Sequence, residues 1–103
     1  PNITSSALHY PGNFGGTAVT GSIPIATATT EFHNYTVEWT QDSIMFVVDD
    51  EFINTSFVNS STSPFNCDFF FIMNIAMGGT LGGAIDSSFI QDTMEVDYIR
   101  VYQ

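Results

Sequence analysis

The sequence NYTVEWT at residues 34–40 places Tyr35, Val37 and Trp39 at alternate positions, with polar side chains between them. Successive side chains of a β-strand point to opposite faces of the sheet, so a period of two predicts a strand with one apolar face. No stretch of the chain has the spacing of an amphipathic helix. The segments are short, rich in β-branched and aromatic residues, and separated by Gly, Pro, Asn and Ser.

The residues that follow predict a β-hairpin. SIMFVV at 43–48 is apolar on both faces and predicts a second strand, and residues 51–58 predict a third that returns alongside it. Asp49 and Asp50 lie between them as a two-residue turn, although Asp suits the second position of such a turn less well than Gly. Before this hairpin, residues 3–10 predict a strand, residues 11–16 a loop, and residues 25–30 an irregular segment or weak edge strand.

Two later segments predict further strands. FFFIMNIA at 69–76 is apolar on both faces apart from Asn74, which is typical of a central strand covered on both sides. Residues 94–102 predict the last strand. Residues 59–64 are expected to form a polar loop, and the four glycines between 78 and 83 a flexible one. With no internal repeat, the 103 residues predict one all-β unit, an antiparallel β-sandwich.

Such a chain is too short to cover all of its own apolar surface. Five or six strands with two-sided apolar faces need a layer on each side, and 103 residues hardly provide both layers and close every edge. We therefore expect a partner, which is either the missing half of a larger sandwich or a second copy of the chain.

Charge excludes several classes of partner. The chain contains eleven acidic residues and one basic residue, Arg100, which gives it a formal net charge of −10. Phosphate backbones and anionic membrane surfaces would be repelled, so we expect neither nucleic acid nor membrane binding. A neutral polysaccharide would be indifferent to this charge. Cys67 is the only cysteine, so no intrachain disulfide can form.

The acidic residues do not form a convincing catalytic pair. Glycoside hydrolysis needs two carboxyl groups on one face of a cleft, about 5–5.5 Å apart when configuration is retained. Glu95 and Asp97 share a strand face, but such acids are more often plain surface charge, and Arg100 beyond them cannot exchange the required proton. Glu38 lies on a polar strand face that is more simply explained by solvation. We therefore predict no catalytic residue in this chain.

Other side chains are candidates for ligand contacts, each with a simpler alternative. Trp39 can stack on the apolar face of a sugar ring or serve as a core residue, and the pattern favours neither. Asn74 needs hydrogen-bond partners inside an apolar strand, from a structural network or from a sugar hydroxyl. His9 and His33 are candidates for a general acid or base, since an ordinary imidazole titrates near neutrality, but most such histidines only satisfy a local hydrogen bond.

Five segments in order then carry a specific resemblance. They are FHNYTVEWT at 32–40, DSIMFVVD at 42–49, PF at 64–65, IMNIAMGG at 72–79 and MEVDYIRVYQ at 94–103. These resemble F-H-x-Y-x-x-E/D-W, I-x-F-Y-V-D-G, P-F, L-N-L-A-V-G-G and V-D-Y-V-R-V-Y-Q of family 16 glycoside hydrolases. ALHY at 7–10 is similar to the family's preceding L-H-Y strand. The resemblance is strongest over residues 32–103.

The resemblance implies a concanavalin-like jelly roll, of which residues 1–103 form one partial domain. It implies a secreted, retaining enzyme of the laminarinase group, acting on β-1,3- or mixed β-1,3-1,4-glucan. In that family the catalytic carboxylates lie on an E-x-D-x-x-E strand upstream of L-H-Y, and the 103 residues contain no such motif. The chain therefore resembles the C-terminal half of such an enzyme, inactive until its N-terminal half completes it.

The resemblance implies a role for each residue of this chain that matches a cleft position of the family. Trp39 matches a cleft tryptophan, His9 lies in the strand that borders the cleft, Phe46 replaces a tryptophan of some relatives, and Asn74 is Asn in the family too. Asp97 matches an Asp that binds calcium in many members, through partners in the absent half. No cofactor is required, and Ca²⁺ is the one candidate ion. The alternative function is a homodimeric glycan-binding module that does not cleave its ligand.

Overall fold

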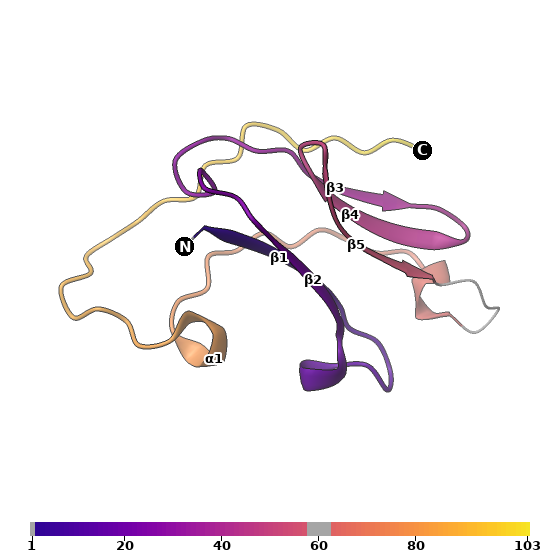
Figure 1. Ribbon diagram of the computed structural model, residues 1–103, viewed down its shortest axis with the longest axis horizontal. Helices are drawn as coiled ribbons and strands as arrows, with labels where there is room; N and C mark the ends of the chain where they lie inside the picture. Colours follow the sequence, from indigo (N-terminus) through magenta and orange to yellow (C-terminus); the bar gives the residue numbers. More distant parts are fainter. Residues whose placement is uncertain (1, 58–62) are drawn as a thin grey trace. The chain divides into compact units, whose positions relative to one another are not determined.

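A computed structural model of the chain describes residues 2–57 and 63–103, without the side chains of residues 54–57. The chain divides into two units, Pro1–Asp68 and Phe69–Gln103, and each is described by itself. Figure 1 shows the strands of the first unit and the extended trace of the second. The expected residue Val58 and most of the expected loop at 59–64 lie outside the described residues.

The first unit begins with a two-stranded antiparallel sheet. β1 (Ile3–Leu8) pairs with β2 (Val19–Pro24), in a register that runs from Ile3 opposite Pro24 to Leu8 opposite Val19. A bridge between Tyr10 and Asn13 and a short 3₁₀ turn, η1 (Gly15–Thr17), connect the two strands. β1 was expected from the sequence, whereas β2 was not.

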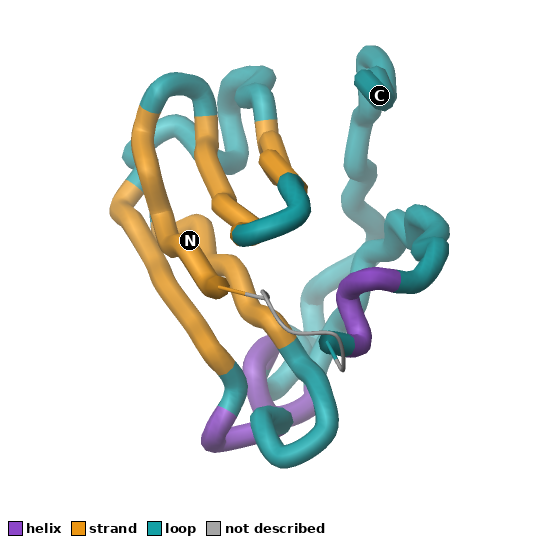
Figure 2. Tube along the Cα trace, turned by 90° about the vertical axis from the view of Figure 1, so that its right-hand side faces the viewer, coloured by secondary structure: helices purple, strands orange, loops and turns teal. Residues whose placement is uncertain are grey.

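The second sheet of this unit is a three-stranded antiparallel meander. β3 (Tyr35–Trp39), β4 (Ser43–Val48) and β5 (Glu51–Phe57) are neighbours in chain order, as the sequence predicted. Figure 2 shows their strands and tight connections in orange and teal. The β4–β5 register shifts at Phe46 and Val47, which is an irregularity that bends a strand locally.

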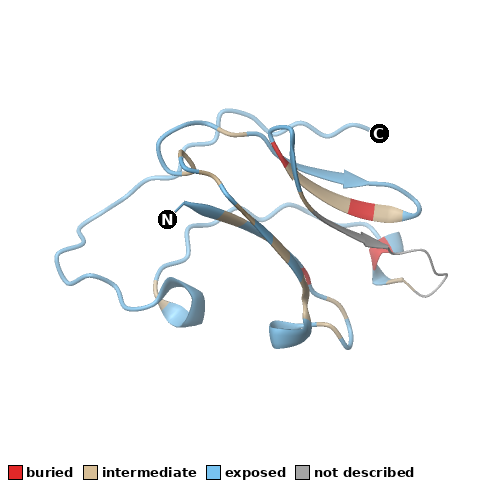
Figure 3. Cartoon of the chain, viewed as in Figure 1, coloured by how far each residue is buried: buried red, intermediate tan, exposed pale blue. Residues whose placement is uncertain are grey.

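A small core lies between the two sheets of the first unit. Leu8 of β1, Ile44 of β4 and Phe65 are buried in one cluster, and Tyr10, Val19 and Phe46 pack against it. Phe65 comes from the 3₁₀ turn η2 (Pro64–Asn66), whose preceding Ser63 accepts a hydrogen bond from the Phe65 amide. Figure 3 shows how few residues are buried.

The second unit differs from the sequence prediction. The segments 69–76 and 94–102 were expected to be strands, but neither forms one, and every residue of both is exposed. A strand exists only when another strand takes up its N–H and C=O groups, and no described strand pairs with these segments. The glycine-rich loop contains a four-residue helix, α1 (Gly79–Gly82), which the sequence analysis did not expect.

The all-β prediction is confirmed. The described residues contain five antiparallel strands, two 3₁₀ turns and one single-turn helix. Within these residues, no helix has both the length and the apolar character needed to cross a membrane. The strands therefore dominate the regular structure of the chain.

Candidate functional site

The β3–β4 hairpin fixes where Trp39 lies. Tyr35 pairs with Val48, Val37 with Phe46, and Trp39 with Ile44. Residues directly opposite in an antiparallel pair project to the same face of the sheet. Tyr35, Val37 and Trp39, which we call the β3 row, therefore share the face on which β4 contributes to the core.

This row is only partly covered, in contrast to its neighbours on β4. Ile44 and Val48 are 4% and 2% exposed, whereas the three residues of the β3 row are 46–58% exposed. The apolar face of the sheet thus continues from a covered strand onto an uncovered edge strand. An apolar face of this kind marks either a packing interface or a ligand surface.

Trp39 and Phe46 are the two aromatic candidates for glycan contact on this sheet. Phe46 is half-buried and packs against the core cluster, so its ring already has a packing role. Trp39 is half-exposed and opposite the buried Ile44, at the margin of the core face. This placement leaves both roles of Trp39 open, and the glycan contacts of both residues stay predictions.

The other two candidates for sugar contact are both exposed. His9 lies between Leu8 and Tyr10, which both contact the core cluster, so the alternation of the strand directs His9 away from that core. Asn74 was expected to be buried in a central strand and to require partners there. It is exposed in the second unit, so the expected cost of burying its amide does not arise.

The acidic candidates are all exposed. Glu38 pairs with Met45 on the face opposite the β3 row and is exposed, which fits the solvated strand face predicted for it. Glu95 and Asp97 are exposed in the second unit. The absence of a catalytic residue among these acids stays a prediction.

Asp97 is the one residue that the resemblance links to calcium. Calcium takes six to eight oxygen ligands, usually with several carboxylates among them. Within residues 2–57 and 63–103, no three His, Cys, Asp or Glu side chains come together as such a group. The calcium role of Asp97 was expected to use partners outside these residues, so it stays a prediction.

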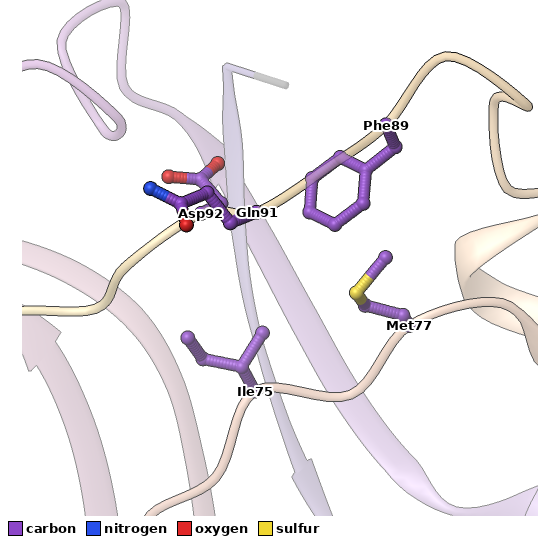
Figure 4. Close-up of a pocket in the computed structure, with 5 residues that line it drawn as sticks. All are labelled: Ile75, Met77, Phe89, Gln91 and Asp92. Atoms are coloured by element: carbon purple, nitrogen blue, oxygen red, sulfur yellow. The ribbon is translucent and has the colours of Figure 1, made fainter.

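A pocket of about 350 Å³ lies in the second unit (Figure 4). Its lining combines apolar and polar side chains: Ile75, Met77, Phe89, Gln91 and Asp92. Figure 4 shows the apolar side chains directed toward a common space, with Gln91 and Asp92 at one side. None of the residues predicted to contact a glycan is among the five.

The sequence analysis did not anticipate a polar cluster around His33. Its Nδ1 lies 2.8 Å from Asp49 Oδ2, and its Nε2 lies 3.1 Å from the Thr27 hydroxyl. The other carboxylate oxygen of Asp49 accepts a hydrogen bond of 2.9 Å from the Asn34 amide. The bond to Asp49 raises the pKa of His33, and the same bond lowers the pKa of Asp49.

This cluster satisfies His33 locally, which is the simpler of the two roles considered from the sequence. Its partners are 6 and 16 residues away in the chain, so no short motif reveals them. The only sequence signal is a histidine just before β3 together with an Asp in the β4–β5 turn. Strands β3 and β4 are neighbours, so these two positions lie at the same end of the sheet.

Comparison with known proteins places these features in a family. The model of glycosyl hydrolases family 16 matches residues 2–100. The whole chain aligns with a β-glucanase of Rhodothermus marinus at 40% identity, over 40% of that protein. It also aligns over its whole length with the glucan endo-1,3-β-glucosidase A1 of Niallia circulans at 32% identity, over 17% of that protein.

Another relative acts on a different polymer. A keratan-sulfate endo-1,4-β-galactosidase of Sphingobacterium multivorum is 33% identical over 73% of the chain and 19% of that enzyme. No solved structure matches the chain. The chain spans 40% or less of the length of these relatives. Because the family model matches nearly every residue, the chain belongs to glycosyl hydrolases family 16.

Proposed function

We propose that this chain is the C-terminal half of a secreted β-glucan endo-hydrolase that cleaves β-1,3- or mixed β-1,3-1,4-glucan with retention of configuration. The observation that carries the proposal is the match of the whole chain to part of a β-glucanase and part of a glucan endo-1,3-β-glucosidase. In this proposal the catalytic carboxylates come from residues outside these 103, and the chain contributes cleft-lining side chains.

The chemistry supports this division of roles. A retaining enzyme needs a nucleophilic carboxylate and a carboxylic acid that first donates and then accepts a proton. In the segment that begins Glu95-Val96-Asp97, the third position beyond Asp97 is Arg100. A guanidinium stays charged and cannot exchange that proton. In this proposal, the charge that develops in the transition state is therefore stabilised by carboxylates outside these 103 residues.

The uncovered β3 row is the structural support for a missing layer. Three apolar side chains on the core face of an edge strand remain about half exposed. In a larger sandwich, a second layer would cover that face and complete the core. Trp39, Phe46, His9 and Asn74 remain our candidates for contact with the glucan in the completed protein.

A chimera tests the proposal most directly. This chain would replace the matched region of the Rhodothermus marinus β-glucanase, which is its 40%-identical relative. We expect the chimera to release reducing sugar from laminarin, since the remainder of the relative provides the missing residues. The 103-residue chain alone and the relative without its matched region are the controls, and both should be inactive.

The alternative outcomes are distinct. Hydrolysis by the isolated chain that is lost on Glu38→Gln or Glu95→Gln would show that the chain carries its own catalytic carboxylates. A well-folded chimera without activity would contradict the proposed division of roles. Calorimetry of the isolated chain with laminarin oligosaccharides checks the glycan-binding alternative, which requires binding that disappears in Trp39→Ala.

A further inference from the structure

A cluster of polar side chains joins the segment before β3 to the turn between β4 and β5. His33 is nearly buried, with 9% of its side chain exposed, and it bridges Thr27 on one side and Asp49 on the other. Asp49 is 49% exposed and uses both carboxylate oxygens, Oδ2 toward His33 and Oδ1 toward the amide of Asn34. The Asp49 amide in turn donates to the Asn34 carbonyl at 2.9 Å.

The turn itself explains why this connection matters. Val48 pairs with Glu51, so Asp49 and Asp50 form a two-residue hairpin loop. Asp49 has φ of +51°, in the left-handed region where Gly is the usual residue of such a loop. Asp also tolerates this conformation when its short side chain makes local hydrogen bonds. The carboxylate of Asp49 therefore connects the turn to the segment in front of β3.

The hydrogen bonds of the cluster are compatible with two charge states of His33. Nδ1–H donates to Asp49 both in one neutral tautomer and in the imidazolium. At Nε2, the Thr27 hydroxyl donates to the neutral ring and accepts from the protonated one, because a hydroxyl can do either. Protonation of His33 therefore keeps the geometry and adds the attraction between opposite charges, which makes the bond to Asp49 stronger.

We propose that His33 and Asp49 form a pH-responsive latch that fastens residues 27–34 to the β4–β5 turn. The latch is tightest at mildly acidic pH and loosens as the pH rises through neutrality. It is independent of the proposed glucanase function, since it needs neither substrate nor the missing layer. The acids that act on the His33 ring are Asp49 and, more weakly, Glu31. The ring of Tyr35 meets it edge-on at 6.4 Å.

The two pKa shifts define the pH window. The pKa of His33 is raised above the ordinary 6.5, so its contribution is complete below 6.5 and is lost as the pH rises through the raised value. The pKa of Asp49 is lowered below 3.8, so its contribution is complete above 3.8 and is lost as the pH falls through the lowered value. Both groups are charged and paired between these limits.

Nuclear magnetic resonance of the imidazole signals tests the latch in the 103-residue chain. We expect the His33 signal to titrate with a midpoint above 6.5, and the Asn34 amide signal to follow the same midpoint. His9→Gln assigns the signals by removing the other histidine. In Asp49→Asn the side chain keeps its size and loses its charge, so the His33 midpoint should fall back toward 6.5.

Asp50→Asn is the matched control. It removes the same charge from the same turn and leaves both bonds of Asp49 in place, so the His33 midpoint should change much less. If Asp49→Asn does not fold, Thr27→Val keeps the ion pair and should leave the midpoint above 6.5. A wild-type midpoint at or below 6.5, or equal effects of the two Asp variants, would overturn the latch.

Discussion

Phe65 is one of the few buried side chains of the first unit. It is 8% exposed and belongs to the core cluster with Leu8 and Ile44. Its ring also meets Tyr10 edge to face, with 5.5 Å between the ring centroids. Such aromatic pairs stabilise the fold by about 0.5–1.5 kcal/mol beyond the stabilisation that comes from the area each ring buries. One residue from a short 3₁₀ turn thus contacts residues of both sheets.

Phe65→Ala should lower the free energy of unfolding of this unit by about 3–5 kcal/mol, since the substitution removes a buried ring and leaves a cavity. Urea unfolding followed by circular dichroism measures the loss. Phe14→Ala is the matched control, because Phe14 is 67% exposed, and it should change stability by about 0.5 kcal/mol or less. If both variants lost a similar amount of unfolding free energy, Phe65 would not be part of a stabilising core.

Single residues also show where the sequence was insufficient. The alternation around Trp39 correctly predicted its strand, but whether its face is a core or a ligand surface depends on what packs against it. The pair of His33 and Asp49 was missed because 16 residues separate its members and only the pairing of β3 with β4 brings them together. Contacts of this kind are set by tertiary structure rather than by local pattern.

At the scale of elements, the meander was predictable and two other parts were not. β3, β4 and β5 have clear apolar patterns and connections of a few residues, so local pairing is enough to form them. β2 contains Gly21 and ends at Pro24, both poor strand formers, and it forms because β1 pairs along its whole length. The segment 69–76, by contrast, has a composition that strongly favours a strand, but no strand of the described sheets pairs with it.

The face of β3 supports a prediction on what covers it. In the chimera with the Rhodothermus marinus β-glucanase, Val37→Lys should abolish activity, since it puts a charge on the face that the missing layer is proposed to bury. Thr36→Lys is the matched control on the same strand, because Thr36 projects to the opposite face and should be tolerated. The laminarin assay compares them, and equal activity of the two variants would mean that the β3 row stays uncovered.

At the scale of the whole molecule, the chain leaves too much apolar surface exposed. Many large hydrophobic side chains of the described residues are exposed, among them Phe70, Ile72 and Ile90 of the second unit. Only four large hydrophobic side chains among the described residues are buried, and the second unit contributes none of them. A second copy could cover the surface, but each copy has a formal charge of −10 and the two would repel. Charge thus favours a partner of different sequence, such as the N-terminal half proposed above.

Hydrogen exchange distinguishes a self-sufficient chain from one that needs this partner. In the isolated chain, amides of β4 should be protected by β3 and β5, whereas amides of segments 69–76 and 94–102 should exchange rapidly because no strand pairs with them. In the chimera, both segments should become protected, since the added residues would take up their hydrogen bonds. The amides of β4 are the internal control and should be protected in both proteins. Protection of 69–76 in an isolated chain that light scattering shows to be monomeric would mean that these 103 residues complete their own fold.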